Sequence, residues 1–264
     1  MAGIVDMMRK VVVLKPKAAI FFSGGLDSTI VLHHLCEQGK GIKAYTARFG
    51  EDEEDCRFAR EVAKLYGISW EEVEIKNFIK KLPWILSGFD RPRYNVWLAY
   101  LTVKAAADGR KVVYAGEGSD EHFGGYSNPD KTYLRAWADH FSFIRPTYEQ
   151  VCRHSQLDLE LPFTKLFWED THPYYWPSEK IKLREAYHKI LPDAVLNREK
   201  APPEFSNYWK LWKKEIQPHF PYYEPKSVED IKEVLQFLAT EAWLKGNSVK
   251  GKRYESNSDS SIYG

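Results

Sequence analysis

In the first half of the chain, apolar residues follow two kinds of spacing, one typical of strands and one typical of helices, in short alternating segments. Runs of apolar residues, or strict alternation, are typical of strands and occur at 11–14 (VVVL), 18–22 (AAIFF), 42–49 (IKAYTARF), 69–75 (SWEEVEI) and 111–116 (KVVYAG). Spacing of three to four predicts helices at 27–35, 51–67 and 94–109. In the second of these helices, Phe58, Val62 and Leu65 are expected to form the buried stripe.

Strand and helix alternate in this half, with short turns between them. That order favours βαβ units and hence a twisted parallel sheet with helices on both faces, an α/β fold. Ligands of such sheets bind beyond the carboxyl ends of the strands. Glycine-rich turns follow residues 22 and 115, both at predicted carboxyl ends. We therefore expect the two turns to meet at one site.

The strand signal ends after Tyr126. Residues 130–220 are predicted to be helices broken by prolines, and residues 228–244 form one more amphipathic helix. The sequence thus predicts a single domain over 1–245, with an α/β nucleotide-binding part (18–126) and a helical part (127–245). The polar segment 246–264 is predicted to be a flexible tail.

Composition narrows the class of protein. The chain has 264 residues and a formal net charge of +1, which argues against nucleic-acid binding by bulk electrostatics. Its three cysteines, Cys36, Cys56 and Cys152, are far apart and form no CxxC pair, as in reduced intracellular proteins. No apolar run reaches the length of about 18 residues that a membrane helix needs. We expect a cytoplasmic protein with no membrane partner.

The first glycine turn, Ser23-Gly24-Gly25-Leu26-Asp27-Ser28, lies between a predicted strand and a predicted helix. Glycine lets backbone amides close on an anion, and the helix start adds free N–H groups. An aspartate fits beside phosphate when Mg²⁺ lies between them. The alternative is a tight turn with an ordinary helix cap. No lysine follows the glycines, so the turn is not a Walker A loop.

The second turn lies within YAGEGSDEHFGGY, residues 114–126. Its acidic residues would, by themselves, equally suit a solvated polar loop. Beside a phosphate-binding turn, Asp120 could supply a second carboxylate for Mg²⁺.

Both turns resemble known signatures. The first is similar to the PP-loop, S-G-G-x-D-S, of enzymes that cleave ATP between the α and β phosphates. The second resembles the G-E-G-S-D-E-x-F-G-G-Y signature of the synthetase domain of asparagine synthetases. Looser similarity follows at 157–164 (LDLELPFT) and 180–206, so that the resemblance covers about residues 18–215. It implies a PP-loop (adenine nucleotide α-hydrolase-like) sheet with a helical half over its carboxyl edge.

The resemblance also implies a role for individual residues, with ATP and Mg²⁺ as cofactors. Asp27 and Asp120 match aspartates that reach Mg²⁺ and pyrophosphate. Glu117 and Lys200 match residues at the reaction centre. The remaining matches bind the nucleotide: Ser23, Gly24, Gly25 and Ser28 hold pyrophosphate, Ala47 and Arg48 hold adenine, and Gly116 lies near the ribose and α-phosphate.

The implied activity is that of an AMP-forming amide synthetase, a carbon–nitrogen ligase that adenylates a carboxylate for attack by ammonia. Aspartate is the expected acceptor, although 157–164 and 87–97 depart from the family pattern. The sequence lacks the family's glutaminase half, so free ammonia, a separate glutaminase subunit or an amine on the substrate is expected to supply nitrogen. Two alternatives stay open: a PP-loop enzyme with another acceptor, such as a lactam synthetase or a tRNA modifier, and a non-catalytic ATP-binding relative. Self-association also stays open.

Overall fold

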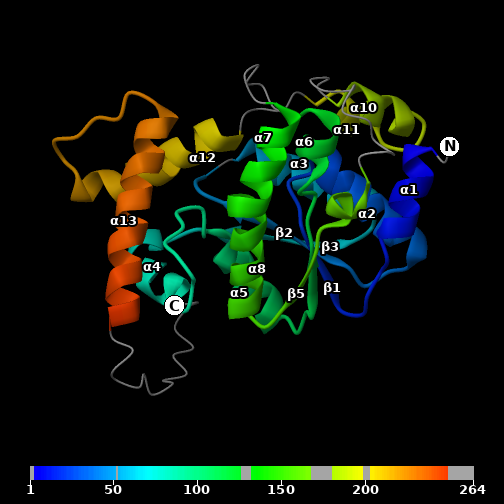
Figure 1. Cartoon of the computed structure of the whole chain (residues 1–264). Coiled ribbons are helices and arrows are strands. Elements are labelled where there is room, and N and C mark those ends of the chain that lie inside the picture. The colour runs from blue at the N-terminus through cyan, green and yellow to red at the C-terminus, as the bar shows by residue number, and fades with distance from the viewer. Residues whose placement is uncertain (1–2, 52, 126–131, 168–179, 199–202, 249–264) are drawn as a thin grey trace.

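The computed structural model describes residues 3–51, 53–125, 132–167, 180–198 and 203–248. Its centre is one parallel sheet (Figure 1). The strand order in this sheet is β3-β2-β1-β4-β5. The strands are β1 (Ala18–Phe21), β2 (Lys43–Arg48), β3 (Ser69–Glu74), β4 (Val112–Tyr114) and β5 (Asp158–Glu160). Because the order of strands reverses beside β1, the carboxyl ends of β1 and β4 are neighbours. The predicted fold class is confirmed.

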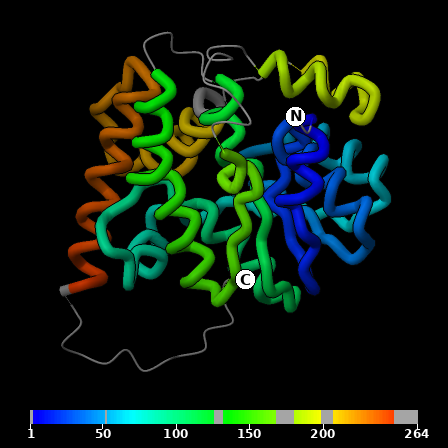
Figure 2. Tube along the Cα trace, turned by 45° about the vertical axis from the view of Figure 1, so that its right-hand side comes forward, coloured from blue at the N-terminus to red at the C-terminus, as the bar shows by residue number. Residues whose placement is uncertain are grey.

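Helices cover both faces of the sheet (Figures 1 and 2). Those that pack on one face are α4 (Phe78–Leu86), α5 (Leu98–Ala107), α8 (Arg145–His154), α12 (Pro203–Leu211) and α13 (Val228–Ser248). Those on the other face are α1 (Ile4–Val11), α2 (Leu26–Gln38), α3 (Glu54–Leu65), α10 (Ile181–Tyr187) and α11 (Asp193–Leu196). Two more, α6 (Ser119–Phe123) and α7 (Tyr133–Asp139), lie at the carboxyl edge. Short π or 3-10 turns are His140–Ile144, Pro162–Lys165, Trp212–Ile216 and Gln217–His219.

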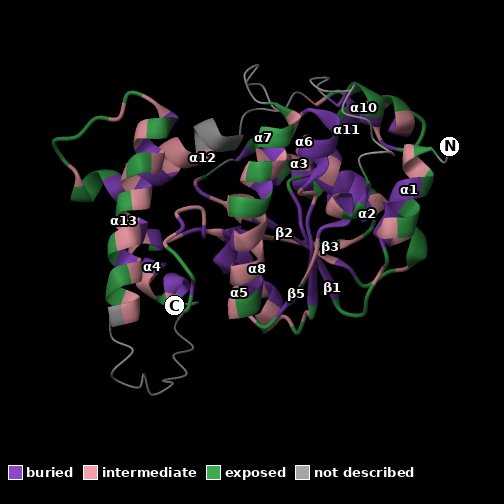
Figure 3. Ribbon diagram, in the orientation of Figure 1, coloured by how far each residue is buried: buried purple, intermediate pink, exposed green. Residues whose placement is uncertain are grey.

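Successive strand residues face opposite helical layers, as the period of a strand requires. In β1, Ala19 and Phe21 belong to the core under α4, α5 and α8, whereas Ala18 and Ile20 belong to the core under α1, α2 and α3. All four are buried, which explains why the strand is a continuous apolar run (Figure 3).

The predicted strand at 11–14 is wrong. Residues 4–11 form α1, and the next three residues have no regular secondary structure and do not join the sheet. Side chains satisfy their backbone groups instead: Gln38 Nε2 donates to the carbonyl of Val12 at 2.7 Å, Tyr114 Oη donates to that of Val13 at 2.6 Å, and the N–H of Leu14 donates to Gln38 Oε1 at 2.9 Å. An apolar run alone cannot distinguish this arrangement from a strand.

Two other expectations also differ from the structure. Strand β5 lies in the stretch where only helices are predicted, because three residues at a sheet edge are too short to show alternation. In α3, Phe58 is partly buried and Val62 is buried, but Leu65 is 69% exposed. The buried face of α3 instead uses the small residues Cys56, Ala59 and Ala63 beside Val62.

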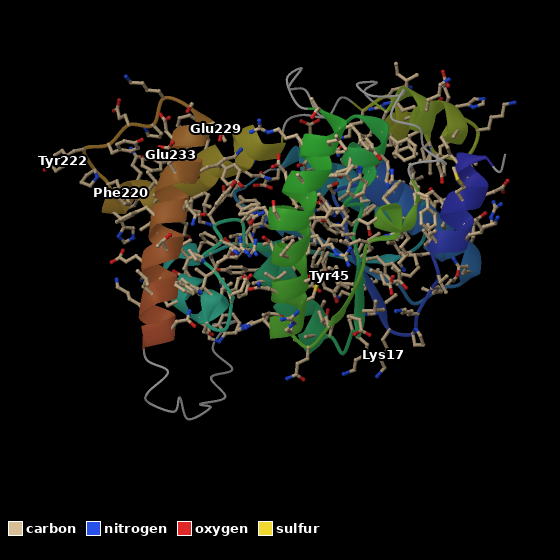
Figure 4. The ribbon with its side chains drawn as sticks, viewed as in Figure 1. Lys17, Tyr45, Phe220, Tyr222, Glu229 and Glu233 are labelled. Atoms are coloured by element: carbon tan, nitrogen blue, oxygen red, sulfur yellow. The ribbon has the colours of Figure 1, made fainter. Side chains whose placement is uncertain are left out.

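The helical part shares a core with the sheet. Leu235 of α13 belongs to the same buried cluster as Phe21 and Tyr45, and Trp243 Nε1 donates to the carbonyl of Phe89 at 2.9 Å. Figure 4 shows Tyr45 of β2 near the middle of the molecule and Tyr222 at the outer end of the helical part.

The last helix, α13, continues to residue 248, beyond the predicted 244, and the predicted tail beyond it lies outside the described residues. Among the helices that the structure describes, none combines the length and apolarity needed to cross a membrane.

Candidate active site

The first glycine turn follows β1 and leads into α2. Gly24 has φ +71°, and a Cβ there would lie 3.0 Å from the Cα of Ala59 in α3, so glycine is required on two counts. The hydroxyl of Ser23 accepts from the N–H of Gly25 at 3.3 Å, and Ser28 Oγ donates to the carbonyl of Gly25 at 3.2 Å. No side chain caps the start of α2, so its first N–H groups are available to an anion.

The second turn lies directly against the first, as predicted. A Cβ on Gly116 would lie 2.8 Å from the Cβ of Asp27 and 2.9 Å from the nitrogen of Ser28. Ser119 Oγ donates a hydrogen bond of 2.8 Å to Asp27 Oδ1, which links the start of α6 to the start of α2. The convergence of the two turns is confirmed, and Gly116 is what allows their backbones to approach.

Asp27 and Asp120 share one cationic side chain. Lys180 Nζ lies 2.5 Å from Asp27 Oδ2 and 2.5 Å from Asp120 Oδ1. The side chain of Lys180 is only 5% exposed, whereas each carboxylate is 24% exposed. Burial opposes the ammonium, but the two carboxylates outweigh it and raise the pKa of Lys180 above its usual value. The three groups therefore form a charged triad at the mouth of the sheet.

The backbone around the triad is adapted to it. Lys180 has φ +63°, a costly conformation for a residue with a side chain, and its N–H donates to the carbonyl of Phe123 at 3.1 Å. A Cβ on Gly125 would overlap Asp120 Oδ1 and Lys180 Cε. The chain thus accepts strain at one residue and an absent side chain at another in order to place the ammonium.

Glu117 lies on the same turn and is paired with Tyr148 of α8. Tyr148 Oη donates a hydrogen bond of 2.6 Å to Glu117 Oε1. Glu117 is half-buried, and the resulting desolvation of its carboxyl group, with repulsion from Glu121, raises the pKa of Glu117 to about 7. A carboxyl group with this pKa can take up and release a proton near neutral pH.

The remaining predicted site residues, Ala47, Arg48 and Lys200, are not part of the triad or of the two glycine turns. Ala47 and Arg48 end β2, beyond its last pair with β1, and are paired with Val73 and Glu74 of β3. The carbonyl of Ala47 accepts from Cys56 Sγ at 3.6 Å, and the guanidinium of Arg48 turns toward Glu72 and Glu74. Lys200 lies outside the described residues.

Just before Lys200 in the sequence, Arg198 reaches the first turn. Its Nη1 donates to the carbonyl of Ser23 at 3.1 Å, its guanidinium lies 4.3 Å from the ring centre of Phe58, and it pairs with Asp55.

Comparison with known families agrees with these motifs. The model of the family described as asparagine synthase matches residues 4–172, which include both glycine turns. This chain belongs to the asparagine synthase family. The resemblance found in the sequence is confirmed.

Relatives of this asparagine synthase family member match it over limited regions. The protein named Amidase chry2 of Gibberella zeae is 30% identical over 171 residues, which cover 52% of this chain and 25% of that protein. A glutamine-hydrolyzing asparagine synthetase of Bacillus subtilis is 32% identical over 114 residues, 40% of this chain and 18% of that protein. The tRNA-specific 2-thiouridylase MnmA 1 of Bacteroides thetaiotaomicron is 36% identical over 66 residues, 22% and 19%. The chain spans a quarter or less of the length of these relatives over the matched regions.

The structure adds Lys180 and Tyr148 to the asparagine synthase motifs. Lys180 is the first residue of the family-like segment KIKLREA, so its position in a motif was the available signal. Nothing in the local sequence distinguishes Tyr148 from the chain's other tyrosines, since its partner is 31 residues away. Only the packing of α8 beside the second turn reveals it.

Proposed function

We propose that this chain is an ATP-dependent amide synthetase that transfers AMP to a carboxylate, with loss of pyrophosphate, and lets ammonia attack the activated acyl group. The observation that carries the proposal is the triad of Asp27, Lys180 and Asp120 where the two glycine turns meet. The proposal is also supported by membership of the asparagine synthase family, because the sequence motifs resemble those of enzymes with this chemistry.

The first turn is suited to hold the polyphosphate of ATP. The N–H groups at the start of α2 and the hydroxyls of Ser23 and Ser28 supply donors, and the helix dipole favours an anion there. The ammonium of Lys180 supplies a buried positive charge toward departing pyrophosphate. Asp120 and Asp27 balance that charge in the structure.

The two aspartates also suit Mg²⁺. Their carboxylate oxygens already converge on a single cation, Lys180 Nζ, and hard oxygen donors in this arrangement are those that Mg²⁺ prefers. When bound, the metal ion would neutralise charge on the phosphates of ATP. Asp27 and Asp120 would hold it, and Ser119 would keep Asp27 oriented through its hydrogen bond.

Glu117 is proposed to accept the proton that ammonia loses as the amide forms. Its carboxylate form, present above a pKa of about 7, is the form that accepts a proton. The hydroxyl of Tyr148 orients the carboxylate and favours its charged form. Aspartate is the first acceptor to be tested.

The test is pyrophosphate release by the purified chain with ATP and Mg²⁺, across a panel of carboxylic acids that includes aspartate, with and without ammonium. We expect AMP and pyrophosphate with at least one acid, and an amide product when ammonium is present. Asp27→Asn and Asp120→Asn are each expected to reduce the rate by about 100-fold or more. Asp158→Asn, an exposed aspartate at the opposite end of the sheet, is the matched control and should not change it. Formation of ADP and phosphate, or full activity of Asp27→Asn, would contradict the proposal.

A second candidate is modification of tRNA, because a tRNA-specific thiouridylase matches 66 residues of the chain. Sulfur transfer by protein thiols requires accessible thiolates. Here burial raises the pKa of the thiol to about 11 for Cys36 and to about 12 for Cys56 and Cys152. The amide synthetase is therefore favoured, and pyrophosphate release that depends on tRNA would reverse that order.

A further inference from the structure

A second cluster of polar side chains lies in the last turns of α2, away from the glycine turn. His33, His34 and Glu37 each offer one donor atom, and these three atoms lie within 4.8 Å of one another. We propose that this cluster is a binding site for one divalent transition-metal ion, with Zn²⁺ as the best match. The proposal concerns a site separate from the amide synthetase centre and does not depend on that function.

The positions in the helix explain why the donors meet. Glu37 is one turn after both histidines, at i+4 from His33 and i+3 from His34, so its carboxylate can reach both of them. Glu37 Oε2 is 2.8 Å from His34 Nδ1, and Glu37 Oε1 is 3.7 Å from His33 Nε2. Tetrahedral Zn²⁺ with bonds of about 2.0–2.1 Å separates its ligand atoms by about 3.3 Å. The two separations involve different oxygens of Glu37, and the three donor atoms lie within 4.8 Å of one another, so small side-chain movements would bring them to this spacing.

The outer hydrogen bond of His34 is the kind that metal-binding histidines make. Its Nε2 lies 2.7 Å from the hydroxyl of Tyr187 at the end of α10, and the imidazole is fully buried. A histidine that binds a metal through one nitrogen normally donates its other N–H to an oxygen, which fixes the ring. Tyr187 therefore holds His34 with Nδ1 directed toward Glu37. Imidazole and carboxylate together suit Zn²⁺ and neighbouring transition metals better than Mg²⁺ or Ca²⁺.

One cation already contacts the cluster. Arg9 Nη2 of α1 is 3.3 Å from Glu37 Oε1, and its Nη1 is 3.0 Å from Asp6. A guanidinium at this position would repel a metal ion and lower its affinity. Arg9 is 52% exposed, so it can release Glu37 while keeping Asp6. Substitution of Arg9 therefore distinguishes two cases. If the cluster binds a metal ion, loss of the guanidinium should strengthen Zn²⁺ binding, whereas if Glu37 serves only the ion pair with Arg9, the substitution should not strengthen it.

The experiment is calorimetric titration of the EDTA-treated full chain with Zn²⁺, supported by the absorption spectrum with Co²⁺. We expect one ion per chain with micromolar affinity. His33→Asn and Glu37→Gln, both at partly exposed positions, should each weaken binding at least about tenfold, and Tyr187→Phe should weaken it by a similar factor. Arg9→Gln should strengthen it about fivefold. His188→Asn, an exposed histidine outside the cluster, is the control and should have no effect.

The Co²⁺ spectrum identifies the ligands. Bands of nitrogen and oxygen coordination without thiolate-to-metal charge transfer are expected, since Cys36 is not part of the cluster. Equal Zn²⁺ binding by the native chain and by a variant that combines His33→Asn with Glu37→Gln would overturn the proposal. So would a charge-transfer band that disappears in Cys36→Ser, or no tightening in Arg9→Gln. Melting temperatures of the ion-free variants exclude misfolding as the cause of a loss.

Discussion

At the scale of the residue, Lys180 combines a buried charge with a strained backbone. A buried ammonium needs carboxylate partners, and removal of Lys180 would leave Asp27 and Asp120 facing each other without a compensating charge. The sequence placed Lys180 in a family-like segment but singled out Lys200 there, and it could not show that Lys180 would meet Asp27, which is 153 residues away.

We expect Lys180→Met to lower the melting temperature of the chain, because Asp27 and Asp120 then face each other without a cation. Millimolar Mg²⁺ should restore part of the loss in this variant and should change the native chain much less. The measurement is a thermal melt with and without MgCl₂. Lys182→Met removes an exposed lysine that pairs with Glu185 and serves as the control. If Lys180→Met melts like the control, the triad contributes nothing to stability.

Tyr148 and Glu117 allow a prediction about pH. The hydroxyl of Tyr148 stabilises the charged carboxylate, so Tyr148→Phe should raise the pKa of Glu117 further above about 7. Carboxyl resonances followed by NMR, with Glu117→Gln to assign the signal, measure this directly. If Glu117 is the base, the rate of amide formation should increase as pH rises through about 7, and this limb should move to higher pH in Tyr148→Phe. An unchanged or lower pKa in the variant would show that the hydrogen bond has no such effect.

At the scale of the element, the sequence was most informative where the spacing of apolar residues and the position of glycines both indicate the same boundary. The segment 18–35 combines a continuous apolar run, two glycines and a helical period, and it forms β1, the first turn and α2 as predicted. The segment 11–14 has the apolar run alone, and there the prediction is wrong, because side chains of Gln38 and Tyr114 replace strand partners that no local rule can foresee. Strand β5 was missed for the opposite reason, since its three residues carry almost no pattern.

The contact between the two turns predicts the effect of Gly116→Ala. The new methyl group would meet the backbone at Asp27 and Ser28, neither of which can move without displacing the start of α2. We expect a loss of about 1–3 kcal/mol in the free energy of unfolding, measured by urea denaturation. Gly3→Ala, where nothing lies within 4 Å of the added carbon, should change stability by less than about 0.5 kcal/mol. Equal effects of the two substitutions would mean that the turns separate readily.

At the scale of the whole molecule, the sheet and the helical part depend on one core. Leu235 of α13 is fully buried in the cluster that also contains Phe21 of β1. We expect Leu235→Ala to reduce stability by about 2–4 kcal/mol. For the native chain and for Leu235→Ala alike, unfolding followed by far-UV circular dichroism and by tryptophan fluorescence should give one coincident transition. Two separated transitions would show that the predicted single domain is in fact two.

Acid stability should depend on the opposite end of the sheet. Asp108 is partly buried, which disfavours its charge, but hydrogen bonds from Lys43, Lys104 and Tyr45 outweigh this and hold its pKa below the usual value. A carboxylate with a depressed pKa stabilises the fold above its unfolded pKa of about 3.9, and this stabilisation disappears as pH falls. Asp108→Asn should therefore cost about 2–3 kcal/mol at pH 7 and progressively less below pH of about 4. Urea denaturation at several pH values tests this, with exposed Asp158→Asn as the control. A cost that does not change with pH would contradict the assignment.

Two contacts between α2 and the chain around α10 are spaced equally along both. Asp27 meets Lys180 at one end and His34 meets Tyr187 at the other, and both pairs of positions are seven residues apart. Seven residues span about 10.5 Å of helix, or two turns. With one contact, the segment that contains α10 could change its angle to α2, whereas two separated contacts fix that angle. The position of the Lys180 ammonium therefore also depends on the contact between His34 and Tyr187, about two helical turns away. Loss of that contact would let Lys180 move relative to Asp27.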